Sequence, residues 1–250
     1  MSLRDKIREF YLDKSGIRTS LESLGHGLDK QNRMAQENLA ATTFSNAIQQ
    51  AEWLKYKSFY PGRWAVEYTF LLTLFRIFEH HKFTNLLEFG LGQTSRMVHQ
   101  YAAFYNVPAI TVEHDAEWID FTRKDTHNAY PINVKVLPLE MVDYNGHKTR
   151  SYQDIKTAFE NQKFDFILVD GPFGSEHYSR SQIIQLAESN IAETFCIIID
   201  DCNRIGEQET VAEVENVLKS RGIKYAINKY YGLSDYVVIC SEDLKFLASL

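Results

Sequence analysis

The segment LLEFGLGQTS, from Leu86 to Ser95, decides the fold of this chain. Its apolar start predicts a buried β-strand, and Gly90 and Gly92 follow where the chain has to turn sharply. Thr94 and Ser95 can cap a new helix, whose first N–H groups then face the end of the strand. Ligands of open α/β sheets bind at such strand ends, so the segment predicts a site for a nucleoside cofactor.

A carboxylate at the end of the next expected strand supports this prediction. The strand Ala109–Glu113 ends in Glu113, 23 residues after Gly90, where an acid can accept hydrogen bonds from both hydroxyls of a ribose. NAD and S-adenosylmethionine (SAM) both contain a ribose. Glu88 would repel a pyrophosphate and attract the methionine amine of SAM, and Ser95 stands where the NAD fingerprint has its third glycine. The sequence therefore favours SAM.

Apolar runs alternate with helical patterns along most of the chain. Strands are expected at 85–89, 109–113, 133–138, 164–169, 195–200, 224–231 and 236–241, and helices at 64–81, 95–105, 117–128, 152–161, 178–189 and 207–220. Only four residues join the last two strands, so these form an antiparallel hairpin. The expected fold is α/β, with a Rossmann-like sheet of five parallel strands plus this hairpin, flanked by helices. The polar residues His147, Lys148 and Arg150 are assigned to a loop.

Residues 1–60 are expected to form a helical extension, and residues 61–250 the main domain. A short apolar stripe near residues 7–11 and a longer helix over 31–57 are separated by an expected break at 24–30, LGHGLDK. The longer helix places Phe44, Ile48, Ala51 and Leu54 on one face. Such an extension is typical of a helical layer or of an arm through which two copies form a homo-oligomer.

Composition excludes several classes of protein. The chain has 27 Lys and Arg against 33 Asp and Glu, a formal net charge of −6, so no basic surface for nucleic acid is expected. No apolar run is long enough to span a membrane, and the charged first residues do not form a signal peptide. The three cysteines do not suit a disulfide framework or a zinc site. A cytoplasmic location is the expectation.

Over residues 64–241 the sequence resembles the class I SAM-dependent methyltransferases. The family motif of an acid, any residue and Gly-x-Gly is matched by Glu88, Gly90 and Gly92, with Thr94 where a third glycine often stands. The resemblance implies that Glu113 binds the ribose. It also implies that Thr94, Ser95 and Asp170 lie in the cofactor site, with adenine contacts from His114 and weaker candidates at Leu139 and Glu140.

Three aspartates follow two neighbouring expected strands. Asp170 ends the segment FDFILVD, and Asp200 and Asp201 end FCIIIDD, so their carboxylates should converge and disfavour one another unless a cation joins them. This pattern resembles metal-dependent O-methyltransferases of the catechol type, which implies that Asp170, Asp200 and Asp201 bind Mg²⁺. The alternative is that these acids cap helices or pair with Arg180 and Arg204.

The loop after Asp170 and the segment before the core supply candidates for the acceptor side. The catechol type has a lysine base at the position of Phe173, so the base is expected to be His177 or Asp170. Tyr60 and Trp64 are candidates for stacking on a sugar, and Arg63 is a candidate for binding an acidic acceptor or the carboxylate of the cofactor. Similarity to methyltransferases encoded among bacterial surface-polysaccharide genes, and of VDGP to plant xylan glucuronic-acid O-methyltransferases, implies a carbohydrate acceptor.

The expected function is thus SAM-dependent O-methylation of a sugar or glycan hydroxyl, assisted by a divalent metal. The alternatives are a metal-independent methyltransferase of small molecules, an NAD-dependent oxidoreductase, and a non-catalytic scaffold that binds the cofactor.

Overall fold

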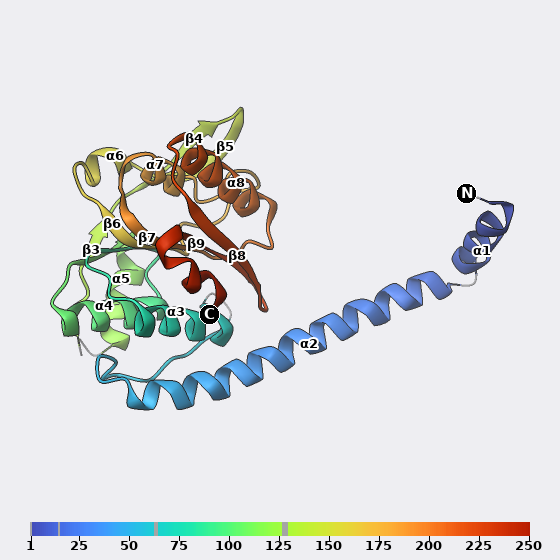
Figure 1. Cartoon of the computed structure of the whole chain (residues 1–250), viewed down its shortest axis with the longest axis horizontal. Coiled ribbons are helices and arrows are strands. Elements are labelled where there is room, and N and C mark those ends of the chain that lie inside the picture. The colour runs from blue at the N-terminus through green and yellow to red at the C-terminus, as the bar shows by residue number, and fades with distance from the viewer. Residues whose placement is uncertain (1, 15, 63–64, 127–129) are drawn as a thin grey trace.

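A sheet of seven strands lies at the centre of the globular part (Figure 1). The computed structural model describes residues 2–14, 16–62, 65–126 and 130–250. The strands lie in the order β3-β2-β1-β6-β7-β9-β8. They are β1 (Leu86–Phe89), β2 (Ala109–Glu113), β3 (Val134–Val136), β6 (Phe164–Val169), β7 (Ile191–Ile199), β8 (Tyr225–Tyr231) and β9 (Asp235–Ser241). Strands β3, β2, β1, β6 and β7 run parallel, and β9 is antiparallel to both β7 and β8, so the predicted fold class is confirmed.

Helices cover both faces of this sheet because successive side chains of each strand point to opposite faces. In β1, Leu86 belongs to one apolar core and Leu87 to the other. The first core includes α3 (Tyr68–His80), α4 (Gln93–Tyr105) and the 3-10 helix Glu242–Ser249; the second includes α7 (Gln182–Ser189) and α8 (Ile205–Ser220). Helix α5 (Ala116–Asp125) follows β2. The carboxyl ends of the parallel strands meet at one edge, where the predicted site residues lie.

The chain between β3 and β6 forms a two-stranded sheet, at the top of the view in Figure 1. Its antiparallel strands are β4 (Leu139–Tyr144) and β5 (His147–Tyr152), so the expected polar loop at 147–150 is wrong. The turn consists of Asn145 and Gly146, both with positive φ, which is the residue pair preferred in two-residue hairpins. Because β5 extends to Tyr152, the helix expected at 152–161 is reduced to α6 (Ile155–Ala158).

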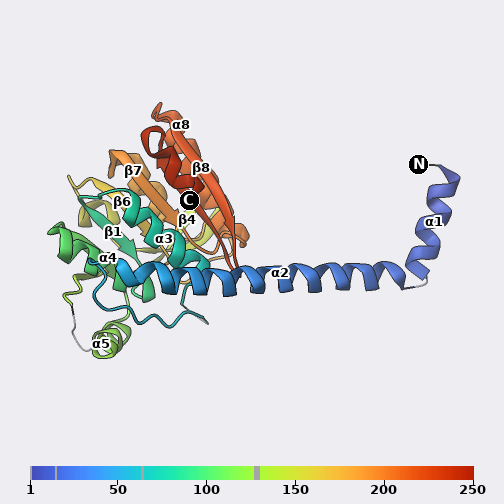
Figure 2. The ribbon, with the colours of Figure 1, turned by 60° about the horizontal axis from the view of Figure 1, so that its bottom comes forward.

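The N-terminal residues form α1 (Leu3–Lys14) and a long helix, α2 (Ile17–Ala47), followed by the 3-10 turn Ile48–Gln50. Figures 1 and 2 show α2 extending far from the globular part. The expected break at 24–30 is wrong, because the helix continues through Gly25 and Gly27 and begins after Gly16, whose φ is +70°. Single glycines weaken a helix without ending it. None of the helices in the described residues is long and apolar enough to cross a membrane.

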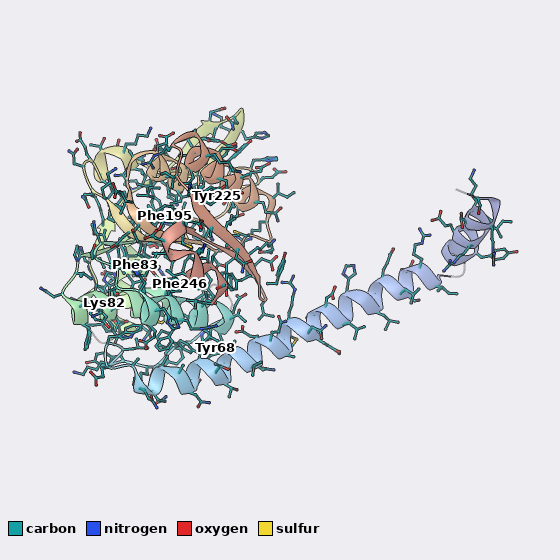
Figure 3. The ribbon with its side chains drawn as sticks, viewed as in Figure 1. Tyr68, Lys82, Phe83, Phe195, Tyr225 and Phe246 are labelled. Carbon is teal, nitrogen blue, oxygen red and sulfur yellow. The ribbon has the colours of Figure 1, made fainter. Side chains whose placement is uncertain are left out.

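The C-terminal end of α2 packs into the globular core. Phe44 in α2 and Ile48 just after it are buried in the first apolar core together with Ala51 and Leu54. The expected helix over 31–57 is wrong beyond the 3-10 turn Ile48–Gln50, so Ala51 and Leu54 enter the core from non-helical chain. Glu37 accepts hydrogen bonds from the backbone N–H groups of Tyr68 (2.6 Å) and Thr69 (3.1 Å), and so satisfies the N-terminus of α3. Figure 3 shows Tyr68 where this helix lies beside α2. The domain boundary at residue 60 stays an expectation, but the core already includes residues of α2.

Candidate cofactor and acceptor site

The glycine turn after β1 packs against the turn after β6. Gly90 has a φ of +93°, and a Cβ atom there would lie 2.7 Å from the carbonyl oxygen of Asp170. A Cβ atom on Gly171 would lie 2.8 Å from the Cα of Gly90, so the two backbones are in direct contact. A Cβ atom on Gly92, by contrast, would meet no described atom within 4 Å. The turn is therefore closed below Gly90 and open at Gly92, where a ligand can approach the start of α4.

Glu88 lies fully buried beneath this turn. Its carboxylate accepts hydrogen bonds of 2.6 Å from the hydroxyls of Thr94, Ser95 and Thr111. Burial raises the pKa of Glu88 to about 7, although the three hydroxyl donors oppose that shift. Ser95 also accepts a hydrogen bond from the N–H of Gly92. Thr94 and Ser95 thus fix the shape of the turn through Glu88, and any contribution they make to cofactor binding acts through that shape.

Glu113 is held at the end of β2 by three backbone N–H donors. Leu91 donates to Oε2 at 3.1 Å, and His114 and Asp115 donate to Oε1 at 2.6 and 3.0 Å. These bonds orient the carboxylate beside the glycine turn. Both lone pairs of Oε1 are engaged, and Oε1 also lies 2.7 Å from Nδ1 of His114, whereas Oε2 keeps one lone pair for a further donor such as a ribose hydroxyl.

Aromatic side chains lie next to this acid. The rings of His114 and Phe173 meet edge to face with centroids 5.3 Å apart, which joins the end of β2 to the loop after β6. Trp118 in α5 donates its indole N–H to the carbonyl oxygen of Leu91 at 2.6 Å. Leu139 and Glu140 begin β4, in the separate two-stranded sheet.

Asp170, Asp200 and Asp201 converge as predicted: each offers a carboxylate oxygen, and these oxygens lie within 4.8 Å of one another. Burial and the neighbouring Asp200 raise the pKa of Asp170 well above its usual range. Burial raises the pKa of Asp200 to about 6, because it outweighs the attraction of Arg180. Asp201 has a φ of +63° and accepts a hydrogen bond from the hydroxyl of Ser234 at 3.1 Å.

Arg180 already joins two of these acids. Its Nη2 donates to Asp201 at 2.5 Å and to Asp170 at 3.4 Å, while Arg204 contacts Asp201 from the more exposed side at 2.9 Å. The carboxylate oxygens are suitable ligands for Mg²⁺. As folded, however, Asp170 and Asp201 already have a cationic partner in Arg180, with which an ion bound here would compete.

His177 lies apart from this cluster. Its Nδ1 is 3.0 Å from Glu209 of α8, and its ring is 4.0 Å from that of His147 in β5. In the described part of the chain, these contacts direct His177 to α8 and β5, and none joins it to Asp170. Its role as a base stays a prediction. Of the candidates in the segment before the core, Tyr60 is exposed, and Arg63 and Trp64 lie outside the described residues.

A cleft of about 590 Å³ opens beside Asp201, between α2 and the turn that joins β8 and β9. It is lined by Glu37, Asn38, Ala41, Pro61, Gly62, Ala65, Glu67, Tyr68, Asp201, Asn203, Arg204, Leu233 and Ser234. Glu67 accepts a hydrogen bond from the N–H of Ser234, whose hydroxyl donates to Asp201. Burial raises the pKa of Glu67 to about 7, opposed by the bond from Ser234. Sequence reasoning missed Glu67, because no motif marks an acid brought to the site by the preceding loop.

No protein-family model and no curated protein matches the chain. Among solved structures it is similar to cofactor-bound Rv0187 from MTB (14% identity, TM-score 0.49, covering 82% of this chain and 89% of that one). It is also similar to an O-methyltransferase from Bacillus cereus in complex with SAH (13%, 0.43, 83% and 91%) and to precorrin-6y C5,15-methyltransferase from Geobacter metallireducens GS-15 (11%, 0.45, 74% and 94%). At these identities the likeness concerns the fold, and function has to be argued from the site.

Proposed function

We propose that this protein transfers the methyl group of SAM to a hydroxyl group of a sugar or glycan. The observation that carries the proposal is the open glycine turn at Gly92 beside the carboxylate of Glu113. This pair fits a nucleoside. In its ionised form, Glu88 beneath the turn adds negative charge, which favours a cationic cofactor over a diphosphate. When bound, SAM supplies an electrophilic methyl group on a positively charged sulfur.

The residues of the chain bind the cofactor, orient the acceptor and accept a proton from its hydroxyl group. Glu113 binds the ribose, and the contact between Gly90 and Gly171 fixes the two strand ends beside which the cofactor lies. The cleft next to Asp201 holds the acceptor. Asp170, whose backbone contacts Gly90 and whose carboxylate lies near that of Asp201, accepts the proton of the hydroxyl in its ionised form. The main contribution of the protein is positioning.

The cleft also supports a carbohydrate acceptor. Its walls combine carboxylates, the side-chain amides of Asn38 and Asn203, the hydroxyl of Ser234 and the guanidinium of Arg204. Such groups form directed hydrogen bonds to several hydroxyls at once, and Tyr68 offers an aromatic surface in the same cleft.

Transfer of a radioactive methyl group from SAM to a panel of monosaccharides, nucleotide sugars and oligosaccharides tests the proposal. Asp170→Asn should abolish transfer while leaving binding of S-adenosylhomocysteine nearly unchanged. Native protein that binds the cofactor and transfers to no member of the panel would favour the scaffold alternative. Binding of NADH with no binding of S-adenosylhomocysteine would favour the oxidoreductase.

Metal-assisted transfer is the second form of this proposal. The convergence of Asp170, Asp200 and Asp201 favours it, and the bonds of Arg180 to two of these acids favour the metal-independent form. Turnover in excess EDTA separates the two forms without affecting the assignment of the cofactor.

The projecting part of α2 supports the expected homo-oligomer. Ile17, Leu21, Leu24 and Leu28 are all exposed, and their spacing of four, three and four residues is that of a coiled-coil seam. A second copy can match all four positions, since Ile17 would pair with Leu28 and Leu21 with Leu24 in an antiparallel arrangement. Sedimentation of a Leu21→Glu, Leu24→Glu variant should give a monomer, whereas the wild type and a variant changed to Glu at His26 on the polar face should associate.

A further inference from the structure

We propose that Arg180 is the built-in cation of the aspartate cluster and takes the place that a divalent metal ion would occupy, so that the native protein binds no such ion there. Contacts within the chain support the absence of ion binding. The further consequence, that methyl transfer requires no divalent metal, rests on the proposed function.

The first support is the number of groups that Arg180 connects. Its Nη1 donates to the carbonyl oxygens of Val169 (3.3 Å) and Asp200 (2.9 Å), and its Nη2 to the carboxylates of Asp170 and Asp201. One planar guanidinium thus joins the ends of β6 and β7 through both their backbone carbonyls and their carboxylates. Its rigid fork of donors suits this arrangement.

The second support is backbone strain around the cluster. Tyr178, Arg180 and Asp201 all have positive φ values, of 46°, 61° and 63°. Each of these conformations is unfavourable for a residue with a Cβ atom, and such residues persist where surrounding contacts fix them. The strained loop places Arg180 under the strand ends, and the strained end of β7 turns Asp201 towards it. These unfavourable backbone conformations need stabilising contacts, and the ion pair between Arg180 and Asp201 is one of them.

The third support is the distribution of charge and exposure. The side chain of Arg180 is 4% exposed, whereas that of Arg204 is 51% exposed. Arg180 Nε also lies 3.8 Å from the fully buried Glu207. A divalent ion among the aspartates would lie close to this buried guanidinium and repel it. Displacing Arg180 from Asp170 and Asp201 would leave its buried charge with only the more distant Glu207, which is unfavourable.

Mn²⁺ measured by electron paramagnetic resonance tests the inference without any assay of activity. The wild-type protein should show no Mn²⁺ binding that is sensitive to Asp200→Asn. Arg180→Met, which removes the charge and keeps an unbranched apolar side chain, should expose the three carboxylates and bind Mn²⁺ at least about tenfold more tightly than the wild type. Mn²⁺ should also raise the melting temperature of Arg180→Met and not that of the wild type. The matched control is Arg204→Met, which removes the outer cation and should not create a site.

Two results would overturn the inference. One is stoichiometric binding of Mn²⁺ to the wild-type protein that Asp200→Asn abolishes, because the cluster then accepts a metal beside Arg180. The other is a natively folded Arg180→Met, checked by circular dichroism, that binds Mn²⁺ no better than the wild type. If Arg180→Met does not fold, the wild-type measurement alone decides. Calorimetry with S-adenosylhomocysteine on the same preparations tests the cofactor assignment separately, so the two failures are distinguishable.

Discussion

Gly90 and Asp170 are in backbone contact across two neighbouring strand ends: a Cβ atom at Gly90 would lie 2.7 Å from the carbonyl oxygen of Asp170. The glycine turn and the loop that begins at Asp170, which we propose to serve the cofactor and the acceptor, are therefore packed against each other through their backbones. A substitution that moves the backbone at either position should affect both.

Alanine at the two glycines of the turn should affect different properties, the stability of the fold at Gly90 and the binding of the cofactor at Gly92. Gly90→Ala combines a positive φ with a backbone collision and should lower the free energy of unfolding by at least about 2 kcal/mol. A Cβ atom at Gly92 would meet no atom within 4 Å, so Gly92→Ala should change stability by less than about 1 kcal/mol. If the cofactor binds in this open space, as we propose, Gly92→Ala should weaken binding of S-adenosylhomocysteine about tenfold. Chemical denaturation and calorimetry measure the two effects. Equal loss of stability in both variants would contradict this geometry.

Glu113→Gln should weaken binding of S-adenosylhomocysteine by about ten- to a hundredfold. The charged acceptor of the ribose hydroxyls is lost, and a hydrogen bond to a charged group contributes about 1.5–3 kcal/mol. Glu117→Gln, in the exposed first turn of α5, is the matched control and should leave the affinity unchanged. If natively folded Glu113→Gln binds S-adenosylhomocysteine as tightly as the wild type does, Glu113 does not bind the ribose.

Glu88 should give the protein a characteristic dependence of stability on pH. Its pKa is about 7 in the folded protein, against 4.5 for the ordinary group, because it is buried. The folded state therefore binds more protons than the unfolded state between pH 4.5 and 7, and the free energy of unfolding falls as the pH rises through this range. The contribution of this group is about 3 kcal/mol. Glu88→Gln should lack this part of the slope, which denaturation at several pH values measures; identical slopes would show that Glu88 does not titrate there.

Filling the cleft from α2 should block the acceptor and spare the cofactor. Ala41→Trp should lower methyl transfer at least about tenfold by raising KM for the acceptor. Ala35→Trp introduces the same side chain on an exposed part of α2 that does not line the cleft, and it should leave KM unchanged. Both variants should bind S-adenosylhomocysteine as the wild type does. If the two tryptophans have the same effect on KM, the acceptor does not bind between α2 and the β8–β9 turn.

The sheet and the glycine turn could be predicted because their signals are local. Apolar runs mark the buried parallel strands, Gly90 and Gly92 mark the turn, and the short connection before Asp235 permits only a hairpin. The pair Asn145-Gly146 is also a local signal, so the β4–β5 hairpin could have been found; the polar character of β5 concealed it. Gly25 and Gly27 lie inside α2, so glycine alone is not a sufficient signal for the end of a helix.

The site could be predicted only in part because its electrostatics depend on long-range contacts. The three aspartates were found from their place at strand ends. That Arg180 joins Asp170 and Asp201 depends on a loop whose backbone conformation has no sequence signature. Glu67 accepts a hydrogen bond at the cleft from the N–H of Ser234, which is 167 residues away in the chain. Which groups neutralise one another at close range follows from tertiary structure.

Calorimetric titration with S-adenosylhomocysteine and, separately, with NADH tests the central claim most directly. An acid beneath the glycine turn and an acid at the next strand end should select the sulfur nucleoside. The account predicts one binding site for S-adenosylhomocysteine, weakened in Glu113→Gln, and no heat with NADH. Tight binding of NADH, or no binding of S-adenosylhomocysteine by protein shown to be folded, would contradict it.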